Sequence, residues 1–133
     1  MKKGRTVLQA KRYGISTCDQ DTTLLEVAQR MTVEEVGALA VVDEGGYLKG
    51  IITRTDLLRA HLEHDDWTTQ VAGNNMSRDV LTVKTDALLF DVAHMLLDHH
   101  VHRIIVVLHE NGKKRPVAVI SSSDLLYHMM RDV

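Results

Sequence analysis

Residues 17–42, TCDQDTTLLEVAQRMTVEEVGALAVV, return without a gap 65 residues later as residues 82–107, TVKTDALLFDVAHMLLDHHVHRIIVV. A second block, residues 52–58, returns 68 residues later, after a short insertion. A period of this length indicates a duplicated supersecondary unit. We therefore expect two copies that pack about a pseudo-twofold axis, with matching polar residues meeting across a shared cleft. The identical pairs of the first block are Thr17/Thr82, Asp21/Asp86, Leu24/Leu89, Val27/Val92, Ala28/Ala93, Val36/Val101, Val41/Val106 and Val42/Val107.

Each copy predicts the same order of elements. An extended lead-in is followed by a helix with apolar residues at helical spacing, and then by two apolar strands joined by a polar turn. A second helix ends each copy, and Thr55 and Ser123 are its expected N-caps. The expected ranges are, in the first copy, a helix from Leu24 and strands at 38–42 and 48–53, and in the second, a helix from Leu89 and strands at 104–108 and 117–121.

The predicted fold class is α+β, with two repeats that each form a small sheet with two helices. Neither half has enough helices to cover both faces of its sheet, so we expect the halves to fold as one body. The expected segments are a basic amino-terminal tail at 1–11, the first repeat at 12–64, a linker at 65–75 and the second repeat at 76–131. The basic residues near the amino terminus are Lys2, Lys3, Arg5, Lys11 and Arg12.

Composition limits the class of protein. The chain has 133 residues and a net charge of −2, which indicates no broad basic face, so we expect no nucleic-acid partner. No apolar run approaches the length of about 20 residues that a membrane span needs, so we expect no membrane partner. Cys18 is the one cysteine of the sequence. It leaves no internal disulfide and agrees with a cytoplasmic location.

Both copies place a hydroxyl at the end of the second strand and a carboxylate three residues later, Thr53 with Asp56 and Ser121 with Asp124. The first turn of a helix suits an anion such as phosphate. A carboxylate there can accept two hydrogen bonds from the vicinal diol of a ribose, each worth about 1.5–3 kcal/mol. In isolation the same pattern is a helix-capping motif, so a structural role stays open. Its duplication in register favours a binding role.

Three features together resemble a tandem pair of cystathionine-β-synthase (CBS) domains, a Bateman module. They are the lead-in at residues 76–83, the stretch at residues 101–107 and the two Thr/Ser-x-x-Asp endings. The resemblance implies a cleft between the repeats that binds AMP, ADP, ATP or S-adenosylmethionine. It also implies roles for single residues: ribose contacts from Asp56 and Asp124, phosphate contacts from Thr53 and Ser121, and adenine framed by the strands near Cys18 and Val83.

The two implied sites differ in charge. The second copy carries His102 and Arg103 where the first carries Gly37 and Ala38. By the resemblance, this basic pair joins Thr53 and Asp56 in one site, and Arg54 adds a second cation. A phosphate near a carboxylate needs such compensation. We therefore expect tighter nucleotide binding at the Asp56 site. The Asp124 site, with Ser121, Ser122 and Ser123, would be empty or prefer a less charged adenosine compound.

The sequence favours a regulatory module over an enzyme, and it indicates no cofactor beyond the adenosine-type ligand. The resemblance implies a homodimer, for which the apolar faces of the helices would supply the contact surface. The regulated protein is not indicated. Two rivals stay open: a structural or protein-interaction module whose cleft is vestigial, and a small hydrolase that uses Asp56 with His102. The abundant histidines predict no metal site, because His99 and His100 project about 100° apart on a helix.

Overall fold

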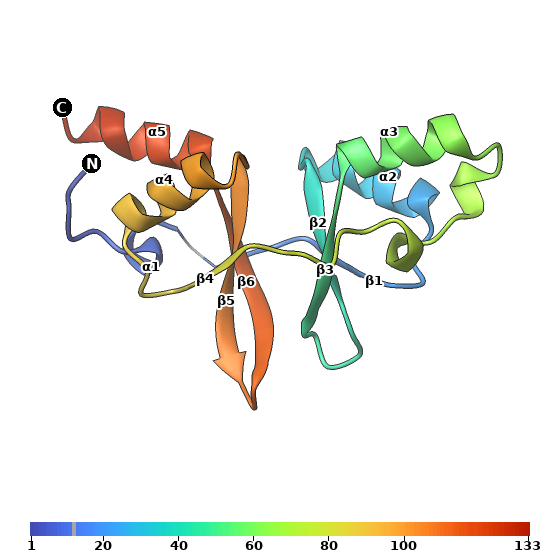
Figure 1. Cartoon of the computed structure of the whole chain (residues 1–133), viewed down its shortest axis with the longest axis horizontal. Helices are drawn as coiled ribbons and strands as arrows, with labels where there is room; N and C mark the ends of the chain where they lie inside the picture. Colours follow the sequence, from blue (N-terminus) through green and yellow to red (C-terminus); the bar gives the residue numbers. More distant parts are fainter. Residues whose placement is uncertain (12) are drawn as a thin grey trace. The chain divides into compact units, whose positions relative to one another are not determined.

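The structure is a computed structural model that describes residues 1–11 and 13–133. Arg12, the first residue of the predicted first repeat, lies outside the described residues. The chain divides into two compact units (Figure 1). One unit is Ile15–Val80, and the other joins Met1–Gly14 to Leu81–Val133. Each unit contains one three-stranded sheet with helices, which confirms the predicted α+β class with two repeats.

The unit Ile15–Val80 is built on a mixed sheet in the order β1-β2-β3. Strand β1 pairs parallel with β2, and β2 pairs antiparallel with β3 across the predicted turn. Helix α2 begins after Thr23, whose side chain accepts the Glu26 N–H. The apolar stripe predicted from the sequence packs inward. The elements are β1 (Thr17–Asp19), α2 (Leu24–Glu34), β2 (Ala38–Val42), β3 (Leu48–Thr53), α3 (Arg54–Glu63), η1 (Trp67–Thr69) and η2 (Ala72–Asn74).

The second unit repeats this arrangement in the order β4-β5-β6. Strand β4 pairs parallel with β5, and the longer β5 and β6 form an antiparallel hairpin, which Figure 1 shows extending beyond the rest of the sheet. The elements are α1 (Val7–Ala10), β4 (Thr82–Lys84), α4 (Leu89–Asp98), β5 (Arg103–Glu110), β6 (Lys113–Ser121) and α5 (Ser122–Arg131). Both α2 and α4 are followed by a left-handed residue at matching places, Glu35 and His100.

The predicted caps of the last helix in each copy are wrong. Thr53 and Ser121, not Thr55 and Ser123, are the N-caps of α3 and α5. In both cases the hydroxyl accepts the backbone N–H of the aspartate three residues on, and the aspartate side chain accepts the N–H of the cap residue. This reciprocal box satisfies two backbone donors. A cap two residues later would leave them without these partners.

Each sheet also pairs with the part of the lead-in that precedes the first strand of the other repeat. The Gly14 N–H donates to the Val117 carbonyl at 2.7 Å, so the segment before β1 joins the sheet that contains β6. In the same way, Ile51 and Ser77 exchange two backbone hydrogen bonds of 2.9 Å, so the segment before β4 joins the sheet that contains β3. The segment boundaries predicted at 1–11, 12–64, 65–75 and 76–131 follow the repeat and stay predictions. The compact units follow this exchange of lead-ins instead.

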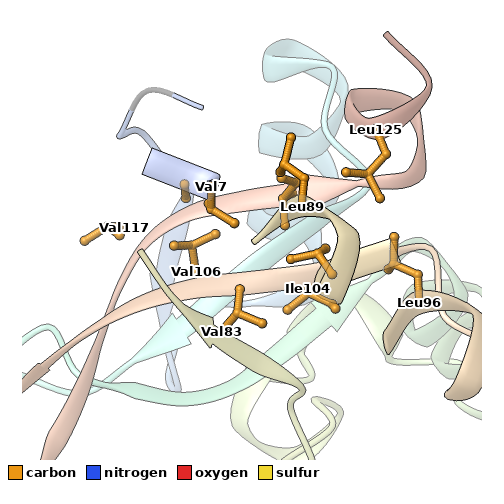
Figure 2. Packing of buried hydrophobic residues seen from close by; sticks show 11 residues of the cluster. Val7, Val83, Leu89, Leu96, Ile104, Val106, Val117 and Leu125 are labelled. Carbon is orange, nitrogen blue, oxygen red and sulfur yellow. The ribbon is translucent and has the colours of Figure 1, made fainter. Parts of the chain in front are cut away.

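The amino-terminal segment is an integral part of the second unit. Val7 of α1 lies in the apolar core, as Figure 2 shows, among residues of β4, α4, β5, β6 and α5. Backbone hydrogen bonds from Val7 to Ala87 and from Leu8 to Thr85 hold α1 in place. Arg5 also donates to Nδ1 of the buried His128, at 3.0 Å. The predicted basic tail is therefore anchored to the second unit through Val7, Leu8 and Arg5, while Lys3 is exposed.

Candidate ligand-binding site

The first candidate carboxylate is Asp56, at the start of α3. Its Oδ2 atom accepts hydrogen bonds from the Thr53 N–H at 2.8 Å and from the Thr53 hydroxyl at 3.1 Å. Its Oδ1 atom lies outside this box and accepts from Arg59 Nη1 at 3.2 Å. The Asp56 side chain is 14% exposed, whereas Arg59, one turn further along the same helix, is 56% exposed. The carboxylate is thus fixed in orientation, and its Oδ1 atom is paired with an exposed arginine side chain.

The second candidate carboxylate, Asp124, has the same internal geometry. Its Oδ2 atom accepts from the Ser121 N–H at 2.8 Å and from the Ser121 hydroxyl at 3.1 Å. It differs in its cation. Lys11 Nζ lies 3.0 Å from Oδ1 and 3.1 Å from Oδ2, reaching across from the segment after α1. We expected no cation at Asp124 from the sequence, and Lys11 supplies one.

The Thr/Ser-x-x-Asp motif can cap a helix and bind a ligand at the same time. In each copy the capping box occupies Oδ2 of the aspartate, and Oδ1 remains outside the box. Because the box fixes the carboxylate, a ligand that bonds to Oδ1 would meet a group already oriented, which lowers the entropic cost of binding. The structural role is therefore confirmed without removing the binding role.

The predicted cations lie as follows. Arg54 is exposed and lines an open hollow of ≈ 560 Å³ between α2 and α3, together with Leu57 and Leu58. Arg103 begins β5 directly opposite Ser121. The N–H of Ser122, the residue after Ser121, donates to the His102 carbonyl. The basic pair therefore flanks the Ser121 end of its own unit. Asp56 belongs to the other unit, and its convergence with this pair stays a prediction.

Cys18 and Val83 occupy equivalent places in β1 and β4, and both side chains are buried in the apolar core of their unit. Burial raises the pKa of the Cys18 thiol to about 11, against a smaller opposing effect of the Arg30 charge. The thiol is thus protonated near neutral pH and behaves as a small apolar side chain. The predicted place of these two residues beside an adenine stays a prediction. Ser123 is exposed in the first turn of α5.

The sequence predicted no binding role for two residues, Lys11 and Tyr13. Lys11 and Tyr13 line an open hollow of ≈ 510 Å³ with Leu8, Gln9 and Ala10. Tyr13 is exposed, so its ring offers a flat apolar surface in this hollow. The repeat spacing of 65 aligns Lys11 with Met76. That alignment marks the position as different in the two copies, but it does not reveal that the lead-in crosses to the other sheet.

Within residues 1–11 and 13–133, no three histidine, cysteine, aspartate or glutamate side chains come together as a group that could hold a metal ion. In the same part of the chain, no helix combines the length and the apolar character needed to cross a membrane.

Comparison with known proteins identifies the repeated unit. The family model described as CBS domain matches the chain twice, at residues 12–63 and 70–131. The chain is 29% identical, over 75% of its length, to arabinose 5-phosphate isomerase KpsF of Escherichia coli, of which it spans 31%. It is 24% identical, over 97% of its length, to Hypoxic response protein 1 of Mycobacterium tuberculosis strain CDC 1551 / Oshkosh, of which it spans 86%.

The fold also matches a solved structure. The CBS domain pair of protein MJ0100, crystallised with 5′-methylthioadenosine and S-adenosyl-L-methionine, superimposes with a TM-score of 0.84 at 22% identity. The match covers 97% of this chain and 98% of that one. It shows that the chain has the fold of a CBS pair.

Proposed function

The chain belongs to the CBS domain family, whose paired domains are regulatory ligand-binding modules, and from this premise we propose that it binds an adenosine-type ligand through Asp56 and Asp124. The candidate ligands are AMP, ADP, ATP and S-adenosylmethionine. The observation that carries the proposal is the shared geometry of the two aspartates: each is fixed by a capping box through Oδ2 and keeps Oδ1 outside that box.

The chemistry of the site suits a nucleoside. A ribose presents two adjacent hydroxyls as donors, and an oriented carboxylate is their natural acceptor. The free backbone N–H groups at the start of α3 and α5 favour a phosphate. Thr53 and Ser121 immediately precede these groups in the sequence. The bound ligands of the MJ0100 structure are adenosine compounds, which supports this choice of ligand class.

Regulation follows if the ligand binds one conformational state more tightly than another. Exposed apolar side chains on α3, α4 and α5 offer surfaces for a homodimer or for a regulated protein, and we propose a homodimer in the cytoplasm. These side chains are Leu58, Leu62, Leu97, Leu126 and Met130. We propose no catalytic activity, and turnover of a bound ligand would contradict this.

The affinity difference predicted from the sequence also stays a proposal: Thr53, Arg54 and Asp56, with His102 and Arg103, form the tighter nucleotide site. Titration calorimetry on Asp56→Ala, Arg103→Ala and Asp124→Ala tests it. Larger losses of nucleotide affinity in the first two variants support the asymmetry, and equal losses in all three contradict it.

The ligand proposal is tested by calorimetry on protein freed of co-purified small molecules, with AMP, ADP, ATP and S-adenosylmethionine as titrants. Asp56→Asn and Asp124→Asn remove the carboxylate charge at each candidate site. Asp91→Asn is the matched control, because Asp91 occupies the same helical position in α4 without a preceding Thr or Ser cap. We expect at least about tenfold weaker binding at the altered site, the effect of one charge-assisted hydrogen bond. Absence of binding by every titrant would favour a structural or protein-interaction module instead.

A further inference from the structure

Lys11 is the feature that most clearly separates the two candidate sites. It follows α1 directly, where its N–H donates to the Val7 carbonyl at 2.9 Å, and Val7 anchors the helix in the core. A capping box between Thr6 and Gln9 fixes the start of α1. The Lys11 backbone is therefore held in place, while its side chain, 33% exposed, crosses to Asp124, whose side chain is 28% exposed.

Both oxygens of the Asp124 carboxylate accept hydrogen bonds from the protein. In the described part of the chain, Oδ2 receives the Ser121 N–H, the Ser121 hydroxyl and Lys11 Nζ, and Oδ1 also receives Lys11 Nζ. A carboxylate offers about four acceptor sites in total. Because Oδ2 is held in the capping box and Lys11 takes one of the two acceptor sites of Oδ1, a ribose diol that donates both its hydrogen bonds to Oδ1 would displace Lys11.

A displaced Lys11 needs a new anion. An uncharged ligand would break the Lys11–Asp124 pair and return nothing to the ammonium. A phosphorylated ligand would break the same pair but would bring an anion for Lys11, whose flexible four-carbon stem lets it turn toward the phosphate. The hollow that Lys11 lines with Tyr13 is open to solvent and gives this movement room.

We propose that Lys11 gates Asp124: it occupies the carboxylate in the empty state and selects phosphorylated adenosine ligands over uncharged ones. The inference rests on the proposed function. It reverses the charge preference that the sequence suggested for Asp124, because that expectation assigned no cation to the site. The equivalent position of the other repeat is Met76, which cannot act in this way.

The test compares AMP with adenosine by titration calorimetry. All variants carry Asp56→Asn, so that the titration reads the Asp124 site. Lys11→Met installs the residue of the equivalent position, Lys11→Gln keeps a hydrogen-bonding side chain in case the first variant fails to fold, and Lys11→Arg keeps the charge. Lys3→Met is the matched control, because it removes an exposed lysine from the same segment.

We expect Lys11→Met and Lys11→Gln to weaken AMP binding and to strengthen adenosine binding, each by about five- to tenfold, the effect of one partly exposed charged contact. The ratio of the two affinities then falls, whereas Lys11→Arg and Lys3→Met leave it near that of the parent. A purely structural ion pair would change both affinities alike, and an unchanged ratio overturns the gate while the proposed function stands. If the protein with native Asp56 and Lys11 binds neither AMP nor adenosine, the gate fails. If it also binds none of ADP, ATP and S-adenosylmethionine, the proposed function fails as well.

Discussion

The two repeats hold the same carboxylate in the same box but neutralise it from different places. Asp56 pairs with Arg59 of its own helix, an exposed side chain one turn away. Asp124 pairs with Lys11, which is 113 residues away in the sequence and belongs to a segment packed into the core. A ligand can displace a partner on the same helix without moving any other segment. A partner on a separate segment instead couples the carboxylate to the position of that segment. Duplication thus conserved the acceptor and left the cation to diverge.

The largest expected effect tests what the two units share. Leu24 and Leu89 occupy equivalent places in α2 and α4, and both are 0% exposed in separate cores. We expect Leu24→Ala and Leu89→Ala each to lower the free energy of unfolding by about 2–5 kcal/mol, because each leaves a cavity. Chemical denaturation measures the loss.

The matched controls for these two changes are the neighbouring Leu25→Ala and Leu88→Ala, since both side chains are exposed. We expect either control to cost less than its buried neighbour. A loss below about 1 kcal/mol for one buried leucine, which is less than the removal of a buried side chain costs, would show that the two cores are not equivalent.

The next effect concerns the exchanged lead-ins. A Cβ atom on Gly50 would lie 2.6 Å from Met76 Sδ and 2.6 Å from the Ser77 carbonyl oxygen. We expect Gly50→Ala to cost about 1–3 kcal/mol, because the incoming segment must shift. The equivalent residue, Ala118, already carries a Cβ, and its partner across the bridge is Gly14. Gly4→Ala is the control, since open space surrounds that position. Equal melting temperatures for both variants would refute the close approach at Gly50.

A smaller effect is expected where the repeats differ in chemistry but not in packing. Cys18→Val installs the residue of the equivalent position, Val83, in the buried part of β1. We expect a change in unfolding free energy of less than about 1.5 kcal/mol, because volume and apolar character are nearly kept. Cys18→Ser is the informative control, since it buries a hydroxyl. A functional thiol would reverse this order in a ligand-binding assay, with Ser tolerated better than Val.

The smallest expected effect is the acid response of the amino-terminal segment. Partial burial acts to raise the pKa of Asp132, but the hydrogen bond from the Lys2 N–H and the charge of Arg5 outweigh it and lower the pKa below its ordinary value of 3.8. The stabilisation is therefore present above pH 3.8 and is lost as the pH falls below it. Thermal unfolding between pH 6 and about pH 2.5 should show the wild type approaching Asp132→Asn in stability, since both lack the charge in acid. A difference between the two proteins that does not change with pH contradicts the coupling.

Much of the fold was predictable because the relevant signals are local. The apolar stripe beginning at Leu24 and Leu89 and the alternation of strand, turn and strand depend on residues near one another in sequence. The N-caps of α3 and α5 were harder to predict from the sequence, because Thr53 and Thr55 are both suitable N-cap residues near the start of the same helix. The choice between them was made by the reciprocal bonds of Asp56 with Thr53. The roles of Asp56 and Asp124 in ribose binding came from the repeated motif and from the family resemblance, and they stay predictions.

The sequence by itself determined the duplication, the order of elements in each repeat and the matching hydroxyl–carboxylate pairs, since each of these is a pattern of residue types at short or regular spacing. Tertiary structure decided that the lead-ins cross to the opposite sheets, that Val7 completes the core of the second unit and that Lys11 neutralises Asp124. The physical reason is range. Periodicity and capping act within a few residues, whereas a contact across 113 residues depends on where packing places both ends of the chain.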